Sequence, residues 1–201
     1  KSRIRYHHFG EGKYEESEKY IQTLLSENGD TVRSNTSVID ARGVQAAADF
    51  QQVRSPETYI GYARAKNFVS TPSIQRNKKT SYQVPKQYQL NDWALDGLWK
   101  IQAEKATLIT AGGKLSFRFQ ARDLHLVLGG PKPIRFRVSM DGKAPLKSHG
   151  VDIDENGYGQ AKEHRLYQLI RQQNNEAMKK DHLFTIEFLD PSVEVYAFTF
   201  G

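Results

Sequence analysis

The stretch LSFRFQARDLHLVLGGPKPIRFRVSMDG (residues 115–142) decides the fold class of this chain. Every second residue is apolar in three successive runs, 115–119, 124–128 and 134–140. Successive side chains of a β-strand point to opposite faces, so a period of two is typical of strands buried on one side. A Gly-Gly-Pro sequence follows the second run, and Asp141-Gly142, a tight-turn pair, follows the third. The stretch therefore predicts half-buried strands joined by turns.

The same pattern continues toward the C-terminus. Three more runs with strand composition follow: residues 164–171, 183–188 and 193–200. Trp93 and Trp99 share one face of an apolar stretch, which favours core packing over stacking on a sugar ring. Residues 70–92 are polar and are expected to be irregular. Together these signals predict a mainly β domain, a jelly roll or β-sandwich, over residues 55–201.

The N-terminal part has a different pattern. Residues 1–12 predict a strand that ends in a Gly turn, and residues 14–27 predict a helix with one apolar face and acidic residues in its first turn. One strand cannot bury that face, so either the rest of a sheet precedes it or the unit (1–29) packs on the downstream domain. The chain begins with Lys1 and not Met, and we expect a piece of a longer protein. Residues 30–54 are predicted to be a linker with a short helix at 44–50.

Composition excludes several classes of function. The 201 residues carry a net charge of +6, but the positive charges are scattered apart from residues 76–79. A nucleic-acid-binding surface would gather them with aromatic residues, so we expect no nucleic-acid partner. The chain contains no cysteine, which excludes thiol chemistry and Cys-bound metals within it. No stretch approaches the roughly 18–20 apolar residues that span a bilayer.

An acidic loop matches the calcium-loop spacing D-x-D-x-N-G-x₅-E. Its candidate metal ligands are Asp152, Asp154, Asn156 and Glu163. Oxygen atoms at alternate positions, followed by a carboxylate after the Gly turn, can surround a hard cation. The flanking residues are not helical, which argues against an EF-hand, and Asn156-Gly157 is also a common hairpin turn. We favour the turn and keep a structural calcium ion as the alternative; no other cofactor is expected.

A set of basic and aromatic side chains forms the candidate ligand-binding face. Its members are Arg135, Arg137, Arg165, Arg171, Tyr167 and, at the tip of the acidic loop, Tyr158. Within each predicted strand the arginines share one side, so neighbouring strands would line one face with guanidinium groups. Such a face binds sugar hydroxyls, carboxylates or phosphates. The alternative, which we favour, is a solvated outer face with cross-strand ion pairs.

The sequence contains no recognisable catalytic motif. The histidines lack a ligand spacing such as H-x-x-x-H, and no G-x-S-x-G, G-x-G-x-x-G or phosphate-loop string occurs. Two carboxylates suited to glycoside hydrolysis are possible on composition alone, but Asp152 and Asp154 lie too close together along a loop to suggest that geometry. We therefore predict no catalytic residue in this chain and hold a hydrolase as a minor alternative.

Several segments resemble DipZ-like extracytoplasmic proteins of the thioredoxin family. They are IRYHHFGEG (4–12), SPETYIGY (55–62), ARDLHLVLG (121–129), RLYQLIRQ (165–172) and the closing run from FLDP (188–191) to YAFTFG (196–201). The segments occur in order across essentially the whole chain.

The resemblance implies the role of a longer parent protein. In that family a membrane-embedded electron-transfer domain or a simple anchor precedes a thioredoxin-like domain, and a β-sandwich similar to carbohydrate-binding modules follows. The family works in thiol–disulfide exchange outside the cytoplasm, so the resemblance implies a periplasmic, membrane-tethered parent. The Cys-X-X-Cys motif would lie before Lys1, and no redox residue is carried over onto this chain.

Two hypotheses for the C-terminal domain follow. In the first, it binds a carbohydrate or cell-wall ligand and localises the redox domain there, which predicts an arginine-lined or aromatic surface on one sheet. In the second, it is a non-catalytic module that docks and orients its own thioredoxin-like domain or a partner protein, which predicts an apolar patch.

Overall fold

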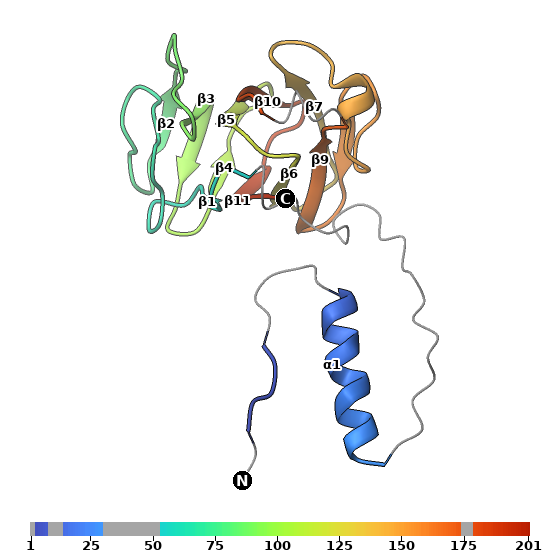
Figure 1. Cartoon of the computed structure of the whole chain (residues 1–201). Helices are drawn as coiled ribbons and strands as arrows, with labels where there is room; N and C mark the ends of the chain where they lie inside the picture. The colour runs from blue at the N-terminus through green and yellow to red at the C-terminus, as the bar shows by residue number, and fades with distance from the viewer. Residues whose placement is uncertain (1–2, 8–13, 30–52, 174–178) are drawn as a thin grey trace. The chain divides into compact units, whose positions relative to one another are not determined.

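A computed structural model describes residues 3–7, 14–29, 53–173 and 179–201, and it divides the chain into two compact units, residues 1–48 and 49–201 (Figure 1). Each unit is described by itself. The helix predicted at 44–50 and most of the predicted linker lie outside the described residues.

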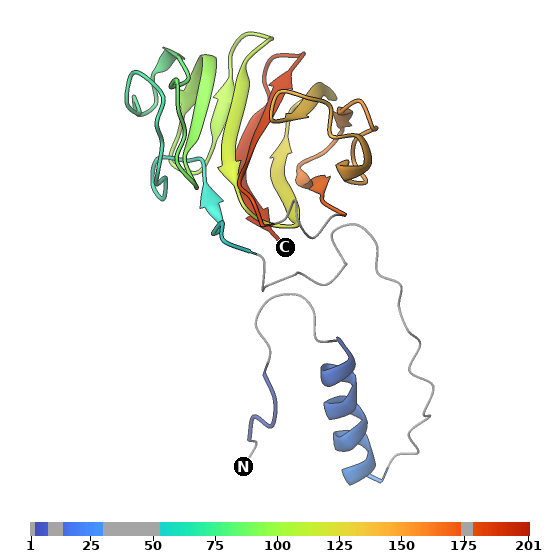
Figure 2. The same ribbon diagram turned by 45° about the horizontal axis from the view of Figure 1, so that its top comes forward.

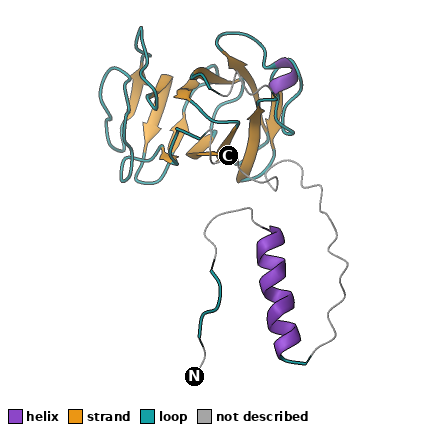
Figure 3. Cartoon of the chain, in the orientation of Figure 1, coloured by secondary structure: helices purple, strands orange, loops and turns teal. Residues whose placement is uncertain are grey.

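The first unit contains helix α1 (Tyr14–Glu27), which confirms the helix predicted from the sequence (Figure 3). Arg5 donates two hydrogen bonds of 2.9 Å to the Glu27 carboxylate, and the rings of Tyr6 and Tyr20 stack with centroids 4.2 Å apart. Residues 3–7 form no strand, so this part of the predicted N-terminal strand is wrong; the rest lies outside the described residues. A strand needs a partner, and within the described residues of this unit there is none.

The apolar face of α1 is exposed to solvent in this chain. Its exposed apolar residues are Tyr20, Ile21, Leu24 and Leu25. In the part of the chain that the structure describes, no helix has the length and apolar content needed to cross a membrane.

The second unit is a β-sandwich of antiparallel strands (Figures 1 and 2). The sheet that we call the β7 sheet has the order β8 (Tyr158–Ala161), β7 (Ile134–Met140), β10 (His182–Phe188), β5 (Lys114–Phe119) and the first half of β3 (Trp93–Ile101). The opposite sheet, called the β6 sheet, has the order β3, β4 (Ala106–Leu108), β11 (Glu194–Phe200), β6 (Asp123–Gly129) and β9 (Arg165–Arg171). Two short strands complete the β6 sheet: β1 (Thr58–Tyr59) pairs with β11, and β2 (Lys79–Tyr82) pairs with β3.

Strand β3 belongs to both sheets. Residues up to Asp96 pair with β5, and Gly97 onward pairs with β2 and then β4. Gly97 has a φ of 95°, a conformation that residues with a Cβ rarely adopt, and it lies where β3 passes from one sheet to the other. The glycine therefore lets one strand serve both layers of the sandwich.

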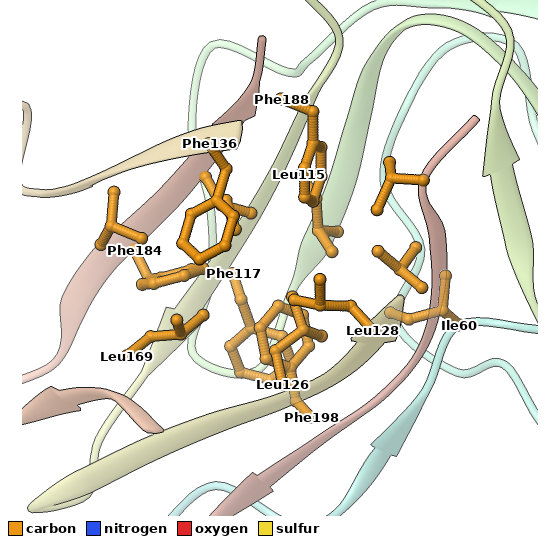
Figure 4. Close-up of a cluster of buried hydrophobic side chains, with 14 of the residues drawn as sticks. Ile60, Leu115, Phe117, Leu126, Leu128, Phe136, Leu169, Phe184, Phe188 and Phe198 are labelled. Atoms are coloured by element: carbon orange, nitrogen blue, oxygen red, sulfur yellow. The ribbon is translucent and has the colours of Figure 1, made fainter. Parts of the chain in front are cut away.

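The core lies between the two sheets (Figure 4). Phe117 of the β7 sheet packs against Phe198 of the β6 sheet with ring centroids 4.9 Å apart. Trp93 and Trp99 are fully buried, which confirms their predicted place in the core. Each large apolar side chain buried in this way contributes roughly 1.5–3 kcal/mol. The mainly β sandwich predicted from the sequence is confirmed.

The predicted irregularity of residues 70–92 is wrong in part. Strand β2 lies within this segment and pairs along its four residues with β3, from Lys79↔Lys100 to Tyr82↔Gly97. The strand is short and largely polar, so its own pattern is too weak to predict it. Pairing with β3 supplies the hydrogen bonds that make it a strand.

Candidate functional site: a polar groove on the β7 sheet

The outer face of the β7 sheet carries a row of four charged side chains and one tyrosine, one from each of five neighbouring strands. The strand registers place them directly opposite one another, in the order Tyr158, Arg137, Glu187, Lys114 and Asp96. Residues that face each other across an antiparallel pair point to the same side of the sheet. Phe136 and Leu115, which adjoin Arg137 and Lys114 along their strands, are buried in the core, and successive residues of a strand point to opposite faces, so this row faces outward.

The next level of the same face carries hydroxyl groups. Ser139 and Ser116 both lie opposite Thr185, and the hydroxyl oxygens of Ser116 and Thr185 are 3.0 Å apart. Tyr88, from the loop before β3, lines the same groove face, and burial raises the pKa of its phenol. Two hydrogen-bonded hydroxyls and a phenol therefore lie beside the charged row. Hydroxyls both donate and accept hydrogen bonds, as sugar hydroxyls do.

This face is hollowed into a groove, which we call the β7-sheet groove. Its larger part has a volume of about 600 Å³ and lies between residues 84–88 and the side chains of β3, β5 and β10. Its smaller part, about 170 Å³, lies between β7, β10 and the turn at residues 142–144. Lys114 and Thr185 line both parts, so the two are continuous.

Ion pairs and ring contacts fix both ends of the groove. Arg118, which lines the larger part, donates from Nε to Asp181 at 2.7 Å, and this contact lowers the pKa of the Asp181 carboxyl. At the other end the Arg137 guanidinium lies over the Tyr158 ring, 5.1 Å from its centre. Tyr158 is 48% exposed, as expected for an aromatic residue available to a ligand.

The predicted arginine face is not assembled as one surface. Strands β7 and β9, which carry its arginines, belong to different sheets and are not hydrogen-bonded neighbours. Arg135 is engaged by Asp190 through hydrogen bonds of 2.8 and 3.0 Å, and these contacts lower the pKa of Asp190 to about 2. Of the predicted ligand-binding set, only Arg137 lines the β7-sheet groove, and Tyr158 lies beside it through its contact with Arg137.

The predicted residues on β9 have structural contacts instead. The Arg165 guanidinium lies 3.7 Å from the centre of the Tyr167 ring and pairs with Asp152. Tyr167 is buried, and its hydroxyl donates to the carbonyl of Glu163 at 2.8 Å. Arg171 lies 3.6 Å from a carboxylate oxygen of the buried Asp123. These contacts hold the β9 residues within the domain, Arg165 by an ion pair with a loop residue and Arg171 beside a carboxylate of β6.

The aspartates of the acidic loop accept hydrogen bonds from the loop itself and from β9. Asp152 accepts from Arg165 and from the Gln168 amide, the latter at 2.7 Å. One Asp154 oxygen accepts from the amides of Asn156 and Tyr158 at 2.9 and 2.8 Å, a local turn of the kind that Asp favours. Gly157 has a φ of 87°, in keeping with the predicted turn.

No metal centre is assembled in the described part of the chain. Among those residues, no group of three or more His, Asp or Glu side chains is placed to hold a metal ion. Glu163 approaches Arg165 at 3.6 Å. The calcium site at Asp152, Asp154, Asn156 and Glu163 stays a prediction, and the contacts of the loop favour the turn.

A second hollow, more apolar than the groove, lies on the β6 sheet beside β1 and β11. Its volume is about 420 Å³, and its lining includes Tyr59, Ala63, Val127 and Ala197. The Arg64 guanidinium covers the Tyr59 ring at 3.4 Å from the ring centre. Tyr196, also in the lining, has its pKa raised to about 12 by burial and by its hydrogen bond to Glu194.

Sequence reasoning missed most of the residues that line the β7-sheet groove. Ser116, Arg118 and Thr185 are the polar members of correctly predicted alternating strands. Alternation indicated that they point away from the core. It could not show that β5 and β10 are neighbours, so it could not bring these side chains together.

The fold and the groove define a β-sandwich domain with a polar groove on the outer face of one sheet. Residues 55–201 match the family described as "Thioredoxin like C-terminal domain", and the chain belongs to this family. It is 26% identical over 144 residues to Protein DipZ of Mycobacterium bovis and to Protein DipZ of Mycobacterium tuberculosis. The match covers 70% of this chain and 19% of each relative, so the chain spans about a fifth of their length.

A solved structure is also similar, at a greater distance. It is a family two carbohydrate esterase from Clostridium thermocellum in complex with cellohexaose, 12% identical, with a TM-score of 0.37. The match covers 49% of this chain and 27% of the esterase chain. Similarity at this level says nothing about a ligand of the present protein.

Proposed function

We propose that this chain carries the carbohydrate-binding C-terminal domain of a DipZ-like thiol–disulfide oxidoreductase, with glycans bound in the β7-sheet groove. The observation that carries the proposal is the groove itself, which crosses several strands and joins connected hydroxyls to basic side chains. Ser116, Thr185 and Tyr88 supply the hydroxyls, and Lys114 and Arg137 supply the charged donors.

The chemistry of the groove suits a sugar better than an apolar ligand. Each sugar hydroxyl needs a donor or acceptor, because an unpaired polar group in a binding site costs about 1–3 kcal/mol. Tyr88 lines the larger part of the groove and Tyr158 lies beside the smaller part, under Arg137, and the flat face of such a ring can pack on the C–H groups of a pyranose. The groove presents both kinds of contact.

The redox chemistry of the parent belongs to another domain in this proposal. The chain has no cysteine, so it supplies no thiol for exchange. Its part is to bring the thioredoxin-like domain close to cell-wall material. The proposal places the protein outside the cytoplasm, in the periplasm, with a membrane tether on the parent.

A binding panel tests the proposal directly. The full chain is titrated with neutral glycans, acidic glycans and peptidoglycan fragments, first with calcium and then with a chelator. Binding that needs calcium would support the acidic loop as a metal site, and binding unaffected by the chelator would exclude a functional calcium ion. Binding of no glycan would overturn the proposal.

A variant ties binding to the groove. Ser116→Ala removes the groove hydroxyl that hydrogen-bonds to Thr185, and we expect glycan affinity to fall about fivefold, as for the loss of one hydrogen bond. Ser73→Ala, at an exposed serine outside the groove lining, is the matched control and is expected to bind as the unaltered chain does. Equal affinity of the two variants would place the site elsewhere.

A second candidate function is docking of the parent's own thioredoxin-like domain. The more apolar hollow beside β1 and β11 supports it, since a partner side chain could fill its volume of about 420 Å³. Titrating the separately prepared thioredoxin-like domain into this chain tests it. Measurable affinity, together with no glycan binding, would favour docking over the first proposal.

A further inference from the structure

The smaller part of the β7-sheet groove is surrounded by positive charge. Lys114, Arg137 and Lys143 line this hollow of about 170 Å³, and Glu187 is its one acidic residue. The lysines and the arginine come from β5, β7 and the turn that follows β7. The formal charge of the four side chains sums to +2.

These three cations lack the ion pairs that satisfy other basic residues of the domain. In residues 53–173 and 179–201, no carboxylate oxygen lies within 4.0 Å of the charged nitrogens of Lys114, Arg137 or Lys143, the limit by which ion pairs such as Arg135–Asp190 are recognised. Arg135, two residues from Arg137 on the same strand, is paired by Asp190 at 2.8 Å. The charge at the hollow is therefore available to a ligand.

Glu187 sets the geometry of the positive charge. The strand register places it between Arg137 and Lys114, opposite both. The Glu187 carboxylate offsets part of the positive charge of the hollow, and the donors of Arg137 and Lys114 lie on either side of it. The three cations outnumber the one carboxylate in the lining, so the hollow as a whole favours an anion.

We propose that the β7-sheet groove selects acidic glycans, with the carboxylate of a uronic-acid or lactyl-bearing sugar held in the smaller hollow by Lys114, Arg137 and Lys143. This inference rests on the proposed glycan-binding function. The hydroxyls of Ser116 and Thr185 hold the sugar ring in the larger part. Lys114 and Thr185 line both parts, so one sugar residue can reach from the hydroxyls into the positively charged hollow.

The test compares glycans that differ only in their carboxylates. The probes are an oligogalacturonate and a muramic-acid-containing peptidoglycan fragment, each as the free acid and as the methyl ester, beside the neutral glycans of the panel. The full chain is titrated at low and at moderate salt. We expect at least one acid to bind about fivefold or more tightly than its ester, and this preference to shrink as salt screens the charges.

Variants assign the preference to the hollow. Lys114→Gln keeps most of the side-chain length and removes one charge, so we expect the acid form to lose about fivefold in affinity and the ester to change little. Lys132→Gln, with the same charge change at an exposed residue outside the groove lining, is the control and is expected to keep the preference.

The outcomes separate this inference from the proposed function. Binding of neutral glycans with no acid preferred over its ester would overturn acidic selectivity and leave glycan binding standing. Binding of no glycan at all would overturn both. An acid preference that Lys114→Gln and Lys132→Gln reduce equally would also overturn the inference, because general electrostatic attraction would then explain it.

Discussion

His125 of β6 lies on the outer side of the β6 sheet, between Thr199 of β11 and Gln168 of β9, each 3.4 Å away. Burial lowers the pKa of this imidazole from its ordinary value of 6.5, although the nearby Asp123 acts in the opposite direction. The folded domain therefore holds His125 neutral at a pH where an exposed histidine begins to take a proton. A residue of this kind links stability to pH.

Stability is expected to fall as the pH drops below about 6.5, because the unfolded chain then binds a proton that folded His125 resists. The stabilisation that neutral His125 gives the folded state is fully present above that pH. It is lost as the pH falls to the lowered pKa of folded His125. Urea unfolding of the chain and of His125→Gln between pH 5 and 8 measures it. The variant is expected to lose less stability on acidification. The matched control is His7→Gln, at an exposed residue of the first unit. A pH dependence of stability in His125→Gln equal to that of the unaltered chain would contradict the prediction.

Predicted and observed roles diverge most among the arginines. Arg135, Arg137, Arg165 and Arg171 look equivalent in the sequence, as polar positions in alternating strands. The structure gives Arg135 and Arg165 carboxylate partners, from Asp190 and Asp152. These partners come from elsewhere in the chain, 55 and 13 residues away, so no local pattern identifies them.

At the scale of elements, β3 is the strand that makes a sandwich out of two sheets. Gly97 lies where it changes sheets, with a φ of 95°. A Cβ at this position would lie 3.2 Å from the Cα of Gly113, tighter than most real Cβ contacts. Backbone strain and crowding therefore both oppose any larger residue here.

Gly97→Ala is expected to lower the free energy of unfolding by about 2–3 kcal/mol, from the strained φ and the contact with Gly113. Gly112→Ala is the matched control: its φ is 86°, but nothing lies within 4 Å of the position that a Cβ would take, so about 1 kcal/mol is expected. Urea unfolding followed by tryptophan fluorescence gives both values. Equal losses would show that crowding at Gly113 plays no part.

Strand prediction succeeded for long runs of alternating residues and failed for strands of two to four residues. The runs that became β5, β6, β7, β9, β10 and β11 were each predicted within a residue or two. The short strands β1, β2, β4 and β8 were missed, because two to four residues carry too little alternation to detect. Their hydrogen-bonded neighbours make them strands.

At the scale of the whole molecule, one continuous core joins the two sheets of the second unit. Phe117 of β5 contacts Phe198 of β11 across the sandwich, and Phe184 of β10 packs on the same ring with centroids 5.8 Å apart. A core shared in this way makes the two sheets unfold together.

Phe117→Ala is expected to cost about 3–5 kcal/mol, as large-to-small changes of buried aromatic residues do. The variant, if it still folds, is expected to lose far-UV circular dichroism and tryptophan fluorescence in a single urea transition, as the unaltered chain does. Leu146→Ala is the control. Little change in the free energy of unfolding is expected, because the Leu146 side chain is 58% exposed. Separate transitions for the two signals would contradict a single shared core.

By itself, the sequence determined the class of fold, the limits of β5, β6, β7, β9, β10 and β11, the helix at residues 14–27 and the lack of any thiol in this chain. These features depend on local periodicity and on composition, which need no knowledge of neighbours. Only the tertiary structure decided which polar side chains stand together. Arg137, Glu187, Lys114 and Asp96 come from four strands, and the order and register of those strands, set by burial of the opposite face, brought them into one groove.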